Sequence, residues 1–159
     1  PYLLDNHVMV KAHRMASVAD YKAMYDGLGV NEDEQLSLLK VKLSGIILAY
    51  DSSSEVNSFY IGGVQTWIDK ATRVGLKLRF EAEKRLGKTE TVLWQNGVQF
   101  PLPLTGEVTA LDMLDGIELY ASTCYDTTQM HLATVESMES VDGVISYDYT
   151  SGYPQKLKF

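Results

Sequence analysis

The fold is decided between Ile46 and Leu102, where the chain contains Ile46-Ile47-Leu48-Ala49-Tyr50, Ser58-Phe59-Tyr60-Ile61-Gly62-Gly63, Trp67-Ile68-Asp69-Lys70 and Trp94-Gln95-Asn96-Gly97. These residues predict a strand, a second strand, a long helix and a hairpin, in that order. Local residues specify each element, and no catalytic arrangement of side chains falls on any of them. The stretch therefore favours a structural or binding module over an enzyme.

Two β-hairpins are expected. β-branched and aromatic residues predict a strand over 46–50 that pairs with 58–61, because residues 51–57 between them are typical of turns. In the second hairpin, strands 91–95 and 98–102 flank Asn96-Gly97, a preferred pair for a type I′ turn. This turn fixes the register, so Leu93 should lie opposite Phe100 on the core face and Trp94 opposite Gln99 on the other.

A long central helix is predicted from Val64 to Leu86. Its apolar residues recur at spacings of three and four, at Val64, Trp67, Ile68, Ala71, Gly75, Leu78, Ala82 and Leu86. The polar face would carry Gln65, Asp69, Lys70, Arg73, Lys77 and Lys84. Gly75 costs about 1 kcal/mol inside a helix. Its place on the apolar face predicts a close approach by a neighbouring element, and Gly87 predicts the helix end.

Four further helices are expected, two on each side of this region. Ser17 can cap a helix over 17–26, and Asn31 can cap one that ends near Gly45. After the second hairpin, helices are predicted over 105–123 and, with Asp126 as cap, over 127–139. The tail from Val144 to Phe159 should be extended, with turns at Asp142-Gly143 and Ser151-Gly152.

These elements predict an α+β fold, with two hairpins packed against the long central helix, two C-terminal helices and an N-terminal helical segment. Residues 17–159 should form one domain, and residues 1–16 an extended arm. The sequence begins at Pro1 without a methionine, so we expect either a processed chain or part of a longer one.

Composition excludes several classes of partner. The 159-residue chain has 14 basic and 21 acidic residues and a net charge of −7, without the basic stripe that a phosphate backbone needs. We therefore expect no nucleic-acid partner. No apolar run approaches the roughly 20 residues of a membrane-spanning helix, so no membrane insertion is expected. Cys124 is the single cysteine, which excludes an internal disulfide.

Candidate catalytic and metal-binding residues do not form a recognisable site. Asp51, Ser52, Ser53, Ser54 and Glu55 cluster in one loop, but a nucleophilic serine needs a base within reach, and the only histidine in the C-terminal two thirds of the chain is His131. His131 lacks a second histidine at helical spacing, and His7 and His13 lie in the arm. Asp112, Asp115 and Glu118 are predicted to form a solvated helix face. We predict no catalytic residue, cofactor or metal.

Aromatic residues are the better indication of function. Ten aromatic residues are more than a small core readily accommodates, although most of them can simply pack. They are Tyr60, Trp67, Trp94, Phe100, Tyr120, Tyr125, Tyr147, Tyr149, Tyr153 and Phe159. We expect some to face another subunit or a glycan. The interaction candidates are Trp94, Tyr60, Tyr147, Tyr149 and Tyr153.

Several short motifs resemble a known family. They are Ala49-Tyr50-Asp51-Ser52-Ser53, Val56-Asn57-Ser58-Phe59, Gly62-Gly63, Trp67-Ile68-Asp69-Lys70, Trp94 with Asn96-Gly97, Tyr147-Asp148-Tyr149-Thr150 and Gly152-Tyr153-Pro154. From about Leu43 to Phe159 the chain resembles an uncharacterised domain of phages and prophages, in the version carried by gut Bacteroidetes. That version often forms the C-terminal part of phage structural or tail-fibre-associated proteins. The family offers no established functional residues to carry over.

Three hypotheses follow. The leading one is a non-enzymatic virion or tail-fibre-associated module that self-associates or docks on a neighbouring phage protein, in the virion or in the host cytoplasm during assembly. The first alternative is a carbohydrate-binding tip, in which Trp94 and nearby tyrosines stack on sugars. The second is a small hydrolase that uses the loop from Asp51 to Glu55.

Overall fold

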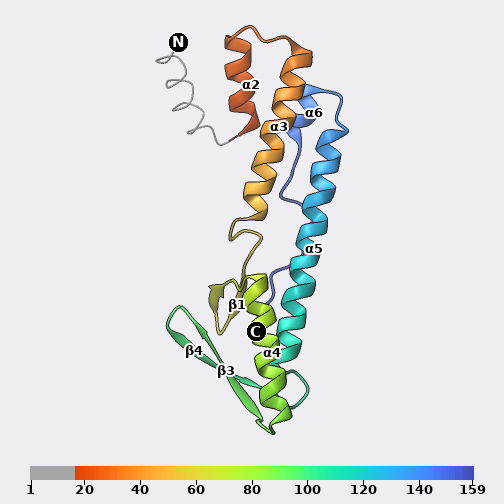
Figure 1. The fold of residues 1–159 in the computed structure, drawn as a ribbon. Coiled ribbons are helices and arrows are strands. Elements are labelled where there is room, and N and C mark those ends of the chain that lie inside the picture. The colour runs from red at the N-terminus through yellow and green to blue at the C-terminus, as the bar shows by residue number, and fades with distance from the viewer. Residues whose placement is uncertain (1–16) are drawn as a thin grey trace. The chain divides into compact units, whose positions relative to one another are not determined.

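A computed structural model describes residues 17–159, so the predicted arm, with His7 and His13, lies outside the described residues. The described chain divides into two compact units (Figure 1). Unit 1 comprises residues 17–50 and 127–151, and unit 2 comprises residues 51–126 and 152–159. Helices occur in both units and the antiparallel hairpins in unit 2. The predicted α+β class is confirmed.

Unit 1 contains α2 (Val18–Gly27), most of α3 (Glu32–Asp51), α6 (Val141–Ser146) and the last turns of α5 (Ala110–Glu136). Both predicted N-caps are confirmed. The Ser17 side chain accepts a hydrogen bond from the backbone N–H of Asp20, and Asn31 Oδ1 accepts one from the N–H of Glu34. Each cap satisfies a donor that the first helical turn would leave unpaired.

The predicted strand over 46–50 is wrong, because α3 continues through it to Asp51. Leu39, Leu43 and Ile47 recur every four residues and are all buried in the core of unit 1. Burying one such side chain contributes about 1.5–3 kcal/mol, which exceeds the cost of about 1 kcal/mol for Gly45 inside the helix. Helical periodicity therefore outweighs the β propensity of Ile46-Ile47.

The end of unit 1 also differs from the prediction. Asp142 and Gly143 lie in α6, because Ser140 caps this short helix through the N–H of Gly143. From Tyr147 onward the tail has neither helix nor strand apart from one β-bridge in unit 2.

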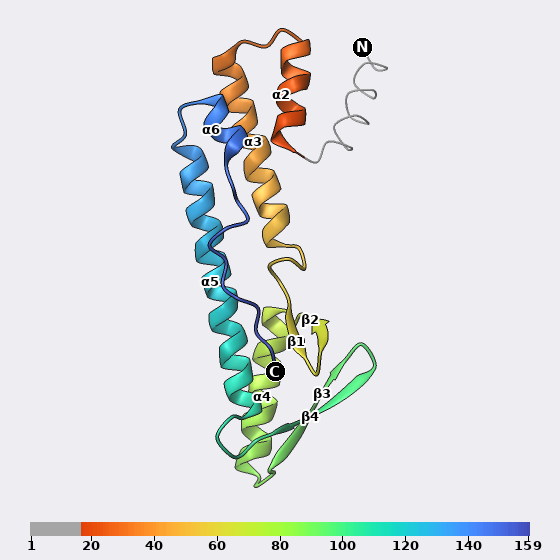
Figure 2. The same ribbon diagram turned by 180° about the vertical axis from the view of Figure 1, so that it is seen from behind.

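Unit 2 contains two antiparallel hairpins and α4 (Lys70–Arg85), which are visible in Figure 2. In the first hairpin, β1 (Phe59–Ile61) pairs with β2 (Val64–Thr66) instead of with residues 46–50. Gly62 and Gly63 both have positive φ and form the two-residue turn. Because a Gly-Gly pair is a hairpin signal, residues 64–66 become strand and cannot start the central helix.

The second hairpin is confirmed in position and register. β3 (Glu90–Gln95) pairs with β4 (Val98–Pro103), with Leu93 opposite Phe100 and Trp94 opposite Gln99. Asn96 and Gly97 both have positive φ, as a type I′ turn requires. Leu93 is buried, and Trp94 projects from the opposite face.

Helix α4 starts at Lys70, six residues later than predicted, and buries a different face. Its buried residues are Arg73 and Phe80, with Leu76 packed partly against the same core. The predicted apolar face, including Leu78, is largely exposed. A Cβ on Gly75 would meet nothing within 4 Å, so the predicted close approach is also wrong. Gly87, at φ +83°, follows the helix end as predicted.

The cap of α4 makes its stability depend on pH. The Asp69 carboxylate accepts hydrogen bonds from the backbone N–H and the hydroxyl of Thr72, which lowers the pKa of Asp69 below its usual 3.8. A lowered folded-state pKa stabilises the protein above the unfolded value, and this stabilisation disappears as pH falls through the folded pKa. We expect Asp69→Asn to lower the thermal midpoint by a few degrees near neutral pH. The difference from wild type should shrink when the pH is taken below 3.8, as the Asp69 carboxylate takes up a proton at its lowered pKa.

Thermal denaturation followed by circular dichroism at the two pH values would test this expectation. Asp126→Asn, at an exposed position inside α5, is the matched control and should leave the midpoint unchanged at both. An equal loss for Asp69→Asn at both pH values would contradict a contribution from the charged cap.

Residues 105–139 form one main helix where two were predicted. Helix α5 runs unbroken from Ala110 to Glu136, so Asp126 caps nothing and Cys124 lies inside the helix. No glycine or proline occurs near 126, and a threonine hydroxyl can bond back within a helix, as Thr123 does to the Leu119 carbonyl at 2.9 Å. The start is set by Thr109 and Asp112, whose side chains each accept a hydrogen bond from the other's backbone N–H.

The core of unit 2 lies where the hairpins meet α4 and the first part of α5. It contains Phe59, Ile61, Ile68, Phe80, Leu93, Leu104, Ala110, Met113, Leu114 and Ile117. Gly62 is needed at its edge, because a Cβ there would lie 3.1 Å from the Phe100 ring and the backbone has φ +54°.

Candidate binding surfaces

The aromatic candidates of unit 1 are engaged in packing. The Tyr147 hydroxyl lies 2.6 Å from His131 Nδ1, and the Tyr149 ring makes an edge contact with Tyr50 at a centroid distance of 5.5 Å. Both tyrosines also pack against the core of unit 1. They therefore stabilise the unit and offer little free aromatic surface.

Among the candidates of unit 2, Trp94 is exposed, and Tyr60 and Tyr153 are half-buried, as Tyr147 and Tyr149 are. Trp94 is 61% exposed on the outer face of the β3–β4 hairpin. Tyr60 is half-buried and lines a hollow of about 340 Å³ with Gly63, Lys158 and Phe159. Tyr153 is half-buried in the tail. The structure thus joins Tyr60 to the tail, which sequence reasoning did not predict.

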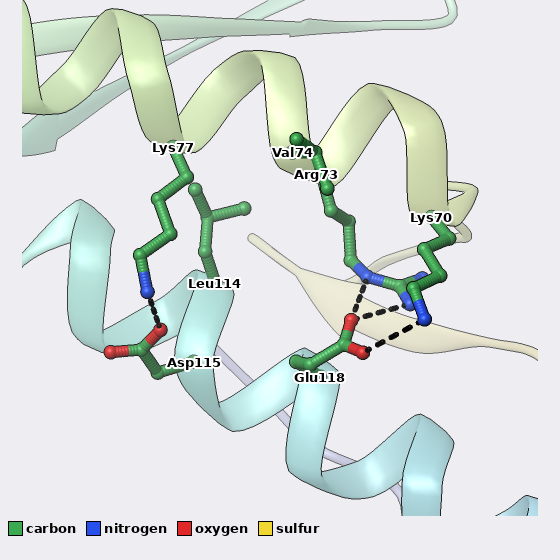
Figure 3. Close-up of a pocket in the computed structure, with 7 residues that line it drawn as sticks. All are labelled: Lys70, Arg73, Val74, Lys77, Leu114, Asp115 and Glu118. Carbon is green, nitrogen blue, oxygen red and sulfur yellow. Dashed lines mark hydrogen bonds and ion pairs between the residues drawn. The ribbon is translucent and has the colours of Figure 1, made fainter.

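Ion pairs join α4 to α5 along a line that we call the α4–α5 seam, formed by Lys70, Arg73, Lys77, Asp115 and Glu118 (Figure 3). Lys77 Nζ lies 2.7 Å from Asp115 Oδ1, and this hydrogen bond raises the pKa of Lys77. Arg73 Nη2 and Nε donate to Glu118 Oε2 at 2.7 and 3.0 Å. The pairing shows that the two helices run antiparallel in unit 2.

Arg73 is the buried member of the seam, with 7% of its side chain exposed. Its Nη1 donates to the Ile68 carbonyl at 2.7 Å, and its guanidinium lies 5.5 Å from the centre of the Trp67 ring. These contacts explain why a residue assigned to the polar face lies inside, since a buried guanidinium is tolerated when its donors are satisfied.

Two hollows open along the seam and share Lys70, Arg73 and Glu118. The first has a volume of about 110 Å³, and Val74 and the buried Leu114 supply its apolar lining (Figure 3). The second has a volume of about 330 Å³ and also includes Ala121, Ser122 and Tyr125. Both hollows combine paired charges with apolar side chains.

An apolar strip on α4 borders the first hollow. This strip, which we call the α4 outer stripe, consists of Ala71, Val74, Gly75 and Leu78, all of them exposed. Val74 is 53% exposed and Leu78 63%, and they lie one helical turn apart on the same face. On the α5 side of the seam, Leu119 and Tyr125 are exposed as well. Single exposed apolar residues are common, and the helical spacing of the four residues in the α4 outer stripe places them on one face of α4.

The serine-rich loop is held by the tail. Lys156 Nζ donates to the Ser58 hydroxyl and to the Ser54 carbonyl, the latter at 2.8 Å, and burial lowers the pKa of Lys156. Ser58 is buried and donates to the Ser54 carbonyl at 2.6 Å. Within the loop, Ser53 Oγ accepts a hydrogen bond from the Glu55 N–H. These groups stabilise the backbone of the loop.

The remaining chemical candidates are placed as follows. His131 is buried in unit 1, and its Nε2 lies 2.8 Å from the Ser151 carbonyl oxygen. Cys124 is buried in unit 2, and burial raises the pKa of its thiol. Within residues 17–159, no group of three or more histidine, cysteine, aspartate or glutamate side chains is arranged to hold a metal ion.

Sequence reasoning missed the seam and the contacts of Lys156. A partial signal was present, because basic residues on α4 (Lys70, Arg73, Lys77) are spaced three and four apart and acidic residues on α5 (Asp115, Glu118) are spaced three apart. Each set therefore lies on one face of its helix. No local signal identifies Ser58 and Lys156, which are 98 residues apart.

Comparison with known proteins gives no relative, because no family model, no curated protein sequence and no solved structure matches this chain. The resemblance to a phage domain stays a prediction. Among the helices of residues 17–159, none has the length and apolar character needed to cross a bilayer.

Proposed function

We propose that this chain is a non-enzymatic structural module that associates with a second copy of itself, or docks on a neighbouring virion protein, through the α4 outer stripe. The observation that carries the proposal is the exposure of Val74 and Leu78 on the face of α4 opposite its buried residues. Sequence periodicity assigned Leu78 to a core, and in unit 2 the core is built from Phe80 and its neighbours instead.

Burial of the α4 outer stripe would contribute favourably to the free energy of association. Covering the exposed parts of Val74 and Leu78 would contribute about 1–2 kcal/mol each. Gly75 has open space beside it and would let a partner backbone approach closely. The neighbouring charges of the seam are already paired within the chain, so they suit the polar rim that surrounds an apolar interface core.

A charge placed in the stripe should prevent this association. We expect Leu78→Glu to convert the associated species to monomer, because it would bury an unpaired carboxylate at the contact. Light scattering during size-exclusion chromatography, over a range of protein concentrations, measures the change. The matched control is Leu86→Glu, at a residue that is 83% exposed at the end of α4 and lines neither hollow.

Two results would count against the proposal. One is a wild-type chain that stays monomeric at high concentration and also binds no phage structural protein. The other is equal dissociation by both glutamate variants, which would place the contact elsewhere or show that added charge acts non-specifically.

The phage context of the proposal comes from the motifs in residues 43–159 and gives the expected location, the virion or the host cytoplasm during assembly. A carbohydrate-binding tip stays the first alternative, and the exposed indole of Trp94 favours it. A hydrolase acting through residues 51–55 stays the second alternative, and the hydrogen bonds of that loop to Lys156 favour a structural role for it.

A further inference from the structure

The end of the described chain lies beside β1, where Lys158 and Tyr60 form a parallel β-bridge (Figure 2). The N–H of Tyr60 donates to the Leu157 carbonyl at 2.9 Å, and the N–H of Phe159 donates to the Tyr60 carbonyl at 2.8 Å. The N–H of Gly62 donates to the Phe159 carbonyl at 3.0 Å. These bonds follow β-augmentation, in which an extended segment completes an open sheet edge. We call residues 152–159 the strap.

Side chains of the strap fill separate places in unit 2. Leu157 packs against the core, and the Phe159 ring meets the Phe59 ring edge-on at a centroid distance of 5.8 Å. Phe159 also reaches Gly116 of α5, where a Cβ would lie 3.9 Å from the ring. Lys156 adds its hydrogen bonds to Ser54 and Ser58. Backbone pairing with separate side-chain contacts is the general form of a peptide-binding site.

The strap is separated in sequence from the rest of unit 2. All other residues of unit 2 form the continuous stretch 51–126, and the strap follows only after residues 127–151 of unit 1. Residues 152–157 contain neither helix nor strand, and Gly152 has φ +81°. The strap is therefore attached to its site by non-covalent contacts and by a connection that leads through the other unit.

We propose that the strap is exchangeable, so that the strap of one copy occupies the β1 edge of a second copy. Every contact described above can form between copies as well as within one, because none depends on which copy supplies the strap. The choice is set by the effective concentration of the tethered strap compared with the concentration of other copies. Exchange is thus favoured where copies are crowded. This interaction uses a different surface from the α4 outer stripe and goes beyond the association proposed for it.

Disulfide trapping between full-length copies tests the exchange. One copy carries Tyr60→Cys and the other Lys158→Cys, because these residues are bridge partners and line the same hollow. Both carry Cys124→Ala to remove the native thiol. After oxidation at close to millimolar concentration, we expect the mixed disulfide dimer in at least about tenfold excess over a control pair in which Val98→Cys, at the exposed hairpin tip, replaces Tyr60→Cys.

A single chain with both Tyr60→Cys and Lys158→Cys should form an internal disulfide. If it does not, the strap does not pair with β1, and the proposal is overturned. Mixed dimer at no more than the control level would overturn exchange. Repeating the test with Leu78→Glu in both copies separates the two proposals. If the mixed dimer still forms, exchange is supported whether or not the outer stripe mediates association. If the mixed dimer is lost, its formation depends on the outer stripe, and an exchange independent of that stripe is overturned.

Discussion

Replacing Phe80 with alanine should lower the free energy of unfolding of unit 2 by about 3–5 kcal/mol, the usual cost of removing a buried aromatic ring. Phe80 is fully buried, and it lies in the core with Phe59, Ile68 and Leu93. Its loss removes the transfer free energy of the ring and leaves a cavity that the surrounding strands and helices fill only in part. A domain is usually stable by only about 5–15 kcal/mol, so this single change is a large fraction of the total.

Leu78→Ala is the matched control, two residues away on the same helix. Since Leu78 is largely exposed, its truncation should change the free energy of unfolding by less than about 0.5 kcal/mol. Urea titration at low protein concentration, followed by tryptophan fluorescence, measures both variants, because Trp67 and Trp94 both lie in unit 2. If Leu78→Ala costs as much as Phe80→Ala, the face assigned to α4 is wrong.

Glu118→Ala should be the most destabilising change in the α4–α5 seam, at about 2–3 kcal/mol. It leaves the buried guanidinium of Arg73 with the Ile68 carbonyl and without its carboxylate partner. Half of the Glu118 side chain is exposed, so water can replace part of the lost interaction and the cost stays below that of a fully buried pair. Glu118→Gln, which keeps an acceptor oxygen, should recover part of the loss.

Asp115→Ala is the control for this series, one turn earlier on α5. Asp115 and its partner Lys77 are both well exposed, so this variant should leave the urea midpoint nearly unchanged. Equal small losses for Glu118→Ala and Asp115→Ala would mean that water reaches Arg73 and that the burial of its side chain carries no electrostatic cost.

Turns and helix caps were predictable from the sequence because residues within a few positions determine them. The register of the second hairpin follows from Asn96-Gly97, since only a few residues adopt positive φ at both turn positions. The caps Ser17 and Asn31 act within three residues, and each was identified without knowledge of the fold. The α+β class follows from these elements together.

Features that depend on distant residues were missed or misassigned. Arg73 becomes a core residue only because Glu118, 45 positions later, supplies its carboxylate. Once Arg73 and Phe80 take the inner face of α4, Leu78 is left outside. Ile46 and Ile47 were assigned to a strand because of their β propensity alone. Leu39 and Leu43 continue the helical face of Ile47, and this longer pattern decides for the helix.

For the candidate site, the sequence predicted an aromatic-rich interaction surface without its location. An excess of aromatic residues indicated an interaction surface, yet Tyr147 and Tyr149 are used for packing within unit 1. Neither the strap nor the outer stripe could be located from composition, because both depend on which neighbours the fold supplies.

The order in which a ribosome makes the chain gives the strap a further consequence. At about 5–20 residues per second, translation of residues 67–151, which separate β2 from the strap, takes about 4–17 s, so β1 exists for that time without the strap on its other edge. An open edge of this kind readily recruits another extended segment. Neighbouring nascent chains on one messenger RNA are then the most concentrated source of identical segments. A chaperone that shields such edges, or a slow rate of initiation, would decide how many chains close on themselves.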